Sequence, residues 1–166
     1  WQAVQLGHDR PTATAPDAIT EVFGVSATAA LYRREALIDG ASGRRGFDER
    51  LVSYYEDVMF AVVSRHRGRR ALTVPGATAA HAGSTTGITL PEHRRLLVAN
   101  RWLTVATLVG RAWPWVWPRV ILRDLADVHR HGDLRGMLTG WGRALRLLPR
   151  FLHRAAPLNV TDYPRS

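Results

Sequence analysis

The chain has 166 residues, 46% of them hydrophobic, so it can bury a core and is too apolar to be disordered throughout. It has no cysteine, which excludes disulfides and thiolate zinc sites. The formal net charge is +9, and all 23 basic residues are arginine, a charge that fits anionic lipid or pyrophosphate as well as nucleic acid.

The first ninety residues alternate predicted strands and helices. After an irregular entry, we expect a buried strand at 21–32, where β-branched, aromatic and small residues gather. Helices are predicted at 33–38 and 56–66, and short strands at 71–74 and 78–80. This alternation is typical of an α/β fold, so residues 1–90 are predicted to belong to a sheet domain.

Residues 91–166 are predicted to form a helical extension. Apolar periodicity indicates helices at 93–110, 120–131 and 133–154, the last with a leucine and tryptophan face. Between the first two, the sequence WPWVWP has Pro114 after the first of three tryptophans and Pro118 after the last, and we expect an extended elbow because proline disfavours helix interiors. No stretch is apolar enough to span a bilayer. The tryptophans and arginines suit packing on the sheet domain or contact with a membrane surface.

Two adjacent carboxylates, Glu56 and Asp57, stand at the start of the predicted helix 56–66. Acids in a first helical turn lie near unpaired backbone N–H groups, which favour their charged form. Taken alone, the pair fits two roles. It can cap the helix, as acids often do, or it can present a fixed carboxylate for proton transfer.

Several motifs occur in an order that resembles one enzyme family. The segments VFGVSATAALYRREAL, GFDER, YYEDVMFAVVSRHRG and VPGATAAHAGSTTG look like the C-terminal half of the catalytic domain of family 2 glycosyltransferases, in particular the rhamnosyltransferase-like branch. The resemblance covers about residues 21–101. It implies a type A glycosyltransferase (Rossmann-like) fold and inverting transfer of a hexosyl or deoxyhexosyl group from a nucleotide-sugar to a hydroxyl of a glycan or lipid-linked acceptor.

The resemblance also implies roles for particular residues. Asp57 matches the general base of the family, and Glu56 would hold the neighbouring loop or the acceptor. His81 matches a histidine that can contact the metal or the diphosphate, and the complete enzyme is expected to hold a divalent metal, Mg or Mn. The residues that match the acceptor side are Phe47, Asp48, Glu49 and Tyr55.

The donor side of such an enzyme is not recognisable in this chain. The family's nucleotide-binding strands and Asp-x-Asp motif would lie upstream of Glu21, and no two aspartates here are two residues apart. We therefore expect the chain to be a piece of a longer enzyme, inactive in sugar transfer by itself.

The expected partners follow from the same resemblance. They are a nucleotide-sugar donor, a glycan or polyprenyl-linked acceptor and a membrane surface, with no nucleic acid. The expected location is cytoplasmic, peripheral on the inner face of a bacterial plasma membrane. The alternative is a non-catalytic basic module that binds a membrane surface or nucleic acid, in which the acid pair only caps its helix.

Overall fold

The structure, a computed structural model, describes residues 17–38, 46–79 and 87–152. Within these ranges the α-helices are α1 (Arg34–Ile38), α2 (Glu56–His66), α3 (Leu90–Val109), α4 (Trp113–His131) and α5 (Leu134–Leu147). Strands β1 (Thr20–Val22) and β2 (Ala71–Thr73) pair antiparallel. Short 3-10 turns lie at Ala27–Ala29, Glu49–Leu51, Gly110–Ala112 and Leu148–Arg150.

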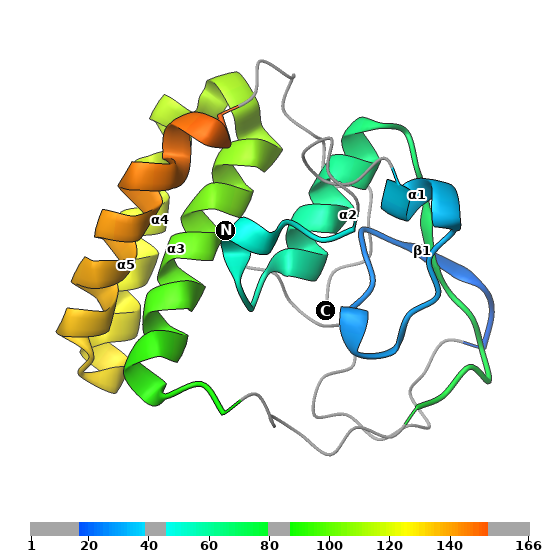
Figure 1. Cartoon of the computed structure of the whole chain (residues 1–166), viewed down its shortest axis with the longest axis horizontal. Helices are drawn as coiled ribbons and strands as arrows, with labels where there is room; N and C mark the ends of the chain where they lie inside the picture. Colours follow the sequence, from blue (N-terminus) through cyan, green and yellow to red (C-terminus); the bar gives the residue numbers. More distant parts are fainter. Residues whose placement is uncertain (1–16, 39–45, 80–86, 153–166) are drawn as a thin grey trace.

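The long helix α3 organises the molecule. In Figure 1, α3, α4 and α5 lie at one end, the region of α1 and β1 lies at the other, and α2 lies between them. Every residue from Val98 to Val109 is buried, as expected for a helix that has neighbours all round. Its apolar side chains form the centre of the main core together with Trp113 and Val120 of α4.

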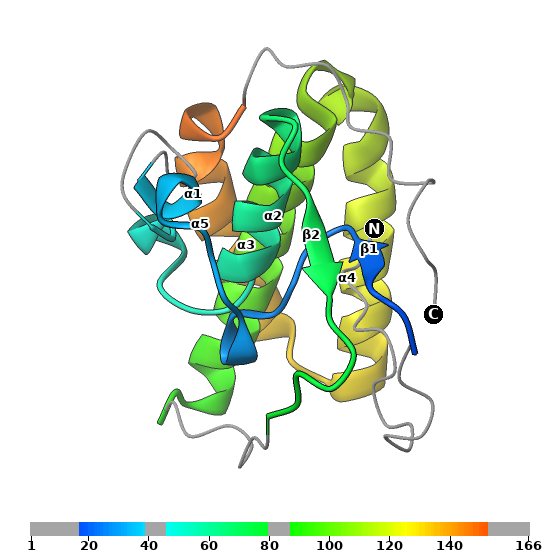
Figure 2. The same ribbon diagram turned by 90° about the vertical axis from the view of Figure 1, so that its right-hand side faces the viewer.

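Helix α2 joins the small sheet to this bundle. Figure 2 shows the two strands beside each other in front of α2. The Arg65 guanidinium of α2 donates to the backbone carbonyl of Phe23 over 2.9 Å and forms an ion pair with Glu21 of β1 over 2.7 Å. On its other side α2 packs against α3. The start of α2 therefore lies between the sheet region and the bundle.

The predicted α/β, Rossmann-like fold of a type A glycosyltransferase is wrong for the described part of the chain. Helices dominate there, and the strands form a single two-stranded antiparallel sheet. The strand expected at 21–32 ends at Val22, because Ser26 caps a 3-10 turn by accepting the Thr28 N–H. At Gly24 the backbone rests directly on α2, where a Cβ would lie 2.3 Å from that of Ala61. Helix α2 therefore packs closely against this segment.

Several of the other predicted elements are confirmed. The helix predicted at 56–66 is confirmed, and α1 and α3 confirm two more within a few residues of the expected ends. The strand predicted at 71–74 is confirmed as β2. No strand forms at residues 78 and 79, and Ala80 lies outside the described residues. The predicted division at residue 90 stays a prediction.

The extended tryptophan elbow is also wrong, because residues 113–131 form one continuous helix, α4. Pro114 lies in the first turn, where a backbone N–H has no helical partner to lose. Pro118 removes one further hydrogen bond, to the carbonyl of Pro114, and both prolines are exposed. The two prolines therefore weaken only the first turns of α4, on its solvent side.

Helix α5 packs on α3 through part of the apolar face predicted from the sequence and through small residues beside it. Of that face, Met137 is buried and Trp141 and Leu148 pack against the main core, whereas Leu134, Leu138 and Leu145 are 52 to 59% exposed. The buried residues of α5 are Gly136, Met137, Gly140 and Ala144. Small side chains let two helices approach closely, so α5 lies tightly against α3 and leaves these three leucines exposed.

Candidate functional site

The acid pair opens helix α2 as the sequence predicted. Asp57 is half-buried, and both of its carboxylate oxygens accept backbone hydrogen bonds. The Ala27 N–H donates to Oδ2 over 3.2 Å, and the Val58 N–H donates to Oδ1 over 2.7 Å. A carboxylate has about four lone-pair positions, so these two bonds fix the group and leave room for a further donor.

A strained backbone turn leads into the acid pair. Val52, Tyr54 and Tyr55 have φ values of 68°, 66° and 67°, a left-handed conformation that side chains other than glycine rarely adopt. Each such residue costs on the order of 1–3 kcal/mol, and residues of this kind cluster at active sites and ligand clamps. A simple helix cap would not require this cost, so the turn indicates a constrained site.

One side chain of α3 holds the strained turn. The side-chain amide of Asn100 is fully buried, and its Nδ2 donates to the carbonyls of Leu51, Ser53 and Tyr54, each over 2.8 Å. Buried carbonyls need partners, and here a single amide serves three of them. The orientation of Glu56 and Asp57 therefore depends on a contact with the bundle.

Buried polar atoms without partners lie close to Asp57. Within the described part of the chain, the Tyr32 hydroxyl and Glu56 Oε2 are buried and make no hydrogen bond. Burial raises the pKa of Tyr32, and the charges of Asp57 and Glu56 raise it further. Burial also raises the pKa of Glu56, and the Asp57 charge adds to this. Unsatisfied buried groups are rare in proteins, and their presence beside a carboxylate points to a missing hydrogen-bonding partner.

An aromatic cluster lies beneath these polar atoms. Tyr32, Phe47 and Phe60 meet edge to face, with ring centroids 5.1 to 5.7 Å apart. This arrangement is favourable for aromatic rings and holds the Tyr32 ring in place. Phe47, one of the predicted acceptor residues, is thus brought near the acid pair through Tyr32.

The other predicted site residues are more scattered. Asp48 is 3% exposed, and its oxygens bind Arg50, so it holds its own loop. Glu49 is exposed. Tyr55 lines a separate cavity together with side chains of α3 and α4. His81 lies outside the described residues. The acceptor-binding and metal-binding roles of these residues remain predictions.

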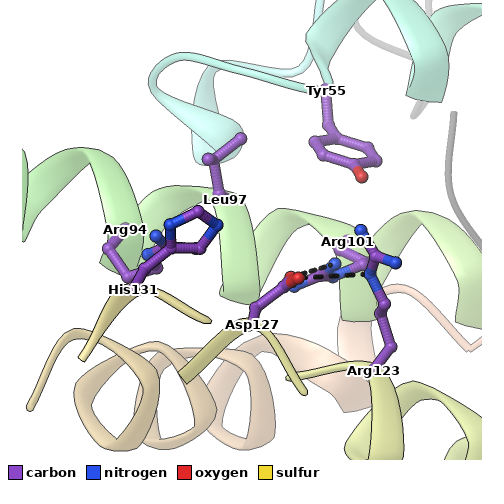
Figure 3. A pocket seen from close by; sticks show the side chains of 7 residues that line it. All are labelled: Tyr55, Arg94, Leu97, Arg101, Arg123, Asp127 and His131. Atoms are coloured by element: carbon purple, nitrogen blue, oxygen red, sulfur yellow. Dashed lines mark hydrogen bonds and ion pairs between the residues drawn. The ribbon is translucent and has the colours of Figure 1, made fainter. Parts of the chain in front are cut away.

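The separate cavity was not predicted. It has a volume of about 210 Å³ and lies between the start of α2, α3 and α4. Figure 3 shows the Tyr55 ring directed towards Arg101 and Arg123, with Leu97 rising from α3. The polar side chains that line it are Tyr55, Arg94, Arg101, Arg123, Asp127 and His131.

A buried ion network forms the floor of this cavity. The Arg101 guanidinium binds Asp127 over 3.0 Å and Asp124 over 2.6 Å. Asp124 is fully buried and also accepts the indole N–H groups of Trp102 and Trp141, each over 2.7 Å. Burial raises the pKa of Asp124, while the neighbouring Arg101 charge acts in the opposite direction. The network joins α3, α4 and α5, so the cavity has a rigid wall.

One sequence signal could have revealed both Asn100 and Arg101. They interrupt an otherwise apolar helix, LLVANRWLTVATLV, at positions that an all-round buried helix would fill with hydrophobic residues. Buried polar groups need partners, so such residues predict a network with neighbouring elements. The partners themselves, on the loop at 51–55 and on α4, could not be read from the sequence.

The described residues show neither a cluster of metal ligands nor a helix that could span a membrane. Among the residues that the structure describes, no group of three or more His, Asp or Glu side chains is placed to hold a metal ion. Within the same ranges, the helices fall short of the length and apolar character needed to cross a membrane.

Comparison of the chain with protein-family models, with curated proteins and with solved structures finds no match. The functional argument therefore depends on the residues of the site itself.

Proposed function

We propose that the chain supplies the acceptor side of an inverting glycosyltransferase, with Asp57 as the general base. The observation that carries the proposal is the fixed, half-buried Asp57 carboxylate, which follows a strained turn and lies near buried polar atoms that have no partner. The motif order around it, described above, agrees with this role. The proposal uses these residues and does not depend on an α/β sheet.

On the acceptor side, the reaction requires a base that is held near the acceptor hydroxyl. An acceptor hydroxyl is a weak nucleophile, and a carboxylate within hydrogen-bond reach can take its proton as the new bond forms. The hydroxyl oxygen bonds to the anomeric carbon while the bond from that carbon to the nucleotide diphosphate breaks on the opposite face, which inverts the configuration. The proton ends on Asp57.

Glu56 has a different role in this scheme. Because burial and the Asp57 charge raise its pKa, Glu56 holds a proton up to a higher pH than an exposed glutamate does. A protonated carboxyl can donate a hydrogen bond to an acceptor oxygen, which an ionised one cannot do. Neighbouring carboxyl groups in different environments commonly divide such tasks.

The metal and the donor are proposed only for the complete enzyme. The described residues do not fit a divalent metal, since they offer no cluster of ligands, and we derive no step through one. The nucleotide-sugar would be bound by a segment upstream of this chain. The chain alone is accordingly expected to transfer no sugar.

The location we propose is the cytoplasmic face of the plasma membrane. Support comes from large apolar side chains exposed on α4, where Trp115 is 80% and Leu122 is 65% exposed, and from the leucines left outside on α5. Exposed arginines, among them Arg119 and Arg146, accompany them. Tryptophan, leucine and arginine together are typical of helices that lie in a membrane interface. A polyprenyl-linked acceptor would be reached there.

A transfer assay tests the proposed function. Transfer of radiolabelled sugar from a nucleotide-sugar is measured with the reading frame extended upstream of Trp1. The Asp57→Asn substitution keeps size and removes basicity, so we expect turnover to fall by about a hundredfold, the usual contribution of a general base. Glu35→Gln, a matched change at an exposed acid of α1, should leave turnover unchanged.

The competing role for Asp57 is a structural one, tying the loop at Ala27 to the start of α2. In that case Asp57→Asn would lower the free energy of unfolding and leave turnover per folded molecule unchanged. Measuring turnover and unfolding on the same preparation separates the two roles.

A further inference from the structure

The cavity between α2, α3 and α4 carries more positive than negative charge. Three guanidinium groups line it, from Arg94, Arg101 and Arg123, against the single carboxylate of Asp127. Even with Asp124 behind the wall included, arginines exceed carboxylates. His131, at the end of α4, adds an imidazole that can donate a hydrogen bond. The cavity is therefore suited to an anion.

The basic side chains of the cavity differ in how many hydrogen bonds and ion pairs they already make. Arg101 is 5% exposed and is held by two aspartates, and Arg123 shares Asp127 with it over 3.3 Å. Arg94 and His131, by contrast, make no hydrogen bond or ion pair with any residue that the structure describes. Both line the cavity, and Figure 3 shows them on the same side of it in that view. They remain available to a ligand.

We infer that this cavity binds a phosphate-bearing ligand, a phosphomonoester or a diphosphate, through Arg94, Arg123 and His131, with the Tyr55 hydroxyl as a further donor. Guanidinium groups bind phosphate oxygens in pairs, and the donors here approach from two helices and one loop. The volume of about 210 Å³ equals roughly seven liquid-water volumes, which leaves room for more than one phosphate group.

The inference is independent of the proposed sugar transfer, because it uses none of the atoms of the acid pair. The two sites are nevertheless adjacent in the chain. Tyr55 lines the cavity, and the next two residues are Glu56 and Asp57. A ligand that contacts Tyr55 would thus act on the turn that positions the acid pair.

Calorimetric titration of the 166-residue chain with inorganic pyrophosphate tests the inference. We expect saturable binding of one pyrophosphate that Arg94→Gln weakens by about tenfold or more, the usual effect of losing one charge-assisted hydrogen bond. Arg111→Gln makes the same charge change at an exposed position at the far end of α3 and should leave the affinity within about twofold. Binding that is absent at millimolar pyrophosphate, or equally weakened by both substitutions, overturns the inference.

A second variant guards against misfolding of the first. His131 is exposed, so His131→Gln should leave the thermal unfolding temperature unchanged while weakening pyrophosphate binding. If Arg94→Gln fails to fold, unchanged pyrophosphate binding by a folded His131→Gln protein overturns the inference.

The source of the phosphate is decided by a parallel experiment with vesicles. Phosphatidylcholine vesicles with and without phosphatidic acid present the same phosphomonoester on a lipid. If vesicles with phosphatidic acid retain the parent chain and do not retain the Arg94→Gln variant, the ligand of the cavity is a lipid headgroup. Pyrophosphate binding without such retention assigns it to a soluble phosphate compound. Both results require the pyrophosphate binding described above, and its absence overturns the inference whether or not the vesicles retain the chain.

Discussion

At the scale of single residues, Asn100 holds the turn that precedes the acid pair. Its amide is the hydrogen-bond donor for three carbonyls of a turn that contains Tyr54 and Tyr55 in left-handed conformation. A strained turn persists only when surrounding structure holds it. Asn100 therefore links the α3 core to the geometry of the acid pair.

Substitution of Asn100 should test this link. Asn100→Ala leaves three carbonyls without this donor, and we expect the free energy of unfolding to fall by about 1–3 kcal/mol. Asn100→Asp has the same shape and replaces the donor by a charged acceptor, so its loss should be larger. Urea unfolding followed by circular dichroism measures both. An alanine variant as stable as the parent would mean that the turn holds its conformation without Asn100.

Glu56 gives the site a pH dependence that can be measured. Because burial raises its pKa above the ordinary value of 4.5, the folded chain binds this proton more tightly than the unfolded chain does. Its contribution to stability is therefore most favourable below about pH 4.5 and is lost as the pH rises through the folded-state pKa. Glu56→Gln imitates the protonated form, so the variant should gain stability over the parent as the pH increases from 4 to 8.

Glu92 supplies a control, because its pKa is shifted in the direction opposite to that of Glu56. A hydrogen bond from Arg95 lowers the pKa of Glu92, so its favourable contribution is present above about pH 4.5 and disappears as the pH falls through its folded-state pKa. Glu92→Gln should lose stability at neutral pH, by a small amount because the pair is exposed. Unfolding free energies of both variants at several pH values are required. A pH-independent effect of Glu56→Gln would contradict the buried state of that carboxyl.

At the scale of elements, the contact between α3 and α5 depends on small residues. A Cβ at Gly140 would lie 2.8 Å from the Cβ of Val98 and 3.0 Å from the Arg95 carbonyl oxygen. A Cβ at Gly142 would meet nothing within 4 Å. The two glycines share a helix and differ only in the face they occupy.

Alanine substitutions at these glycines should move stability in opposite directions. Gly142→Ala improves helix propensity in open space, and we expect a gain of about 0.5–1 kcal/mol. Gly140→Ala forces α5 away from the α3 backbone, and we expect a loss of about 1–3 kcal/mol, typical of overpacking. Chemical denaturation compares the two. A stabilised Gly140→Ala variant would show that α5 does not lie close against α3.

Single elements could be predicted from the sequence where local signals suffice. Helix α2 has acids in its first turn, an apolar interior and Gly68 beyond its end, and its predicted bounds match. The tryptophan elbow failed because proline in a first helical turn costs little, so Pro114 did not mark a break. Three leucines of the apolar face predicted within residues 133–154 are exposed, because hydrophobicity alone does not show which side of a helix permits the closest approach to a neighbour.

At the scale of the whole molecule, the α/β prediction failed for a related reason. Strand propensity at 21–32 was read without knowing which local hydrogen bonds would form, and Ser26 caps a 3-10 turn at Ala27–Ala29 within that stretch. Of the candidate site, the acid pair at the start of α2 was predictable. The cavity was not, since it joins Tyr55 to side chains of α3 and α4 that are 39 or more residues away along the chain.

The distribution of exposed apolar residues predicts membrane binding by the helical end of the molecule. The chain should co-sediment with vesicles that contain anionic phosphatidylglycerol, and the double change Trp115→Ser and Leu122→Ser should reduce the bound fraction severalfold, since each removes exposed apolar area that would enter the interface. Leu31→Ser, at a fully exposed leucine before α1, is the matched control. Equal binding by all variants would place the membrane contact elsewhere.

The central claim is that Asp57 removes a proton from an acceptor hydroxyl. Its most direct test is the dependence of sugar transfer on acceptor concentration, measured for the upstream-extended protein and its Asp57→Asn variant. An interaction made only in the transition state lowers kcat without weakening acceptor binding, so we predict that kcat falls about a hundredfold while the KM for the acceptor stays within about threefold. A raised KM with unchanged kcat, or no change in either, would contradict the claim.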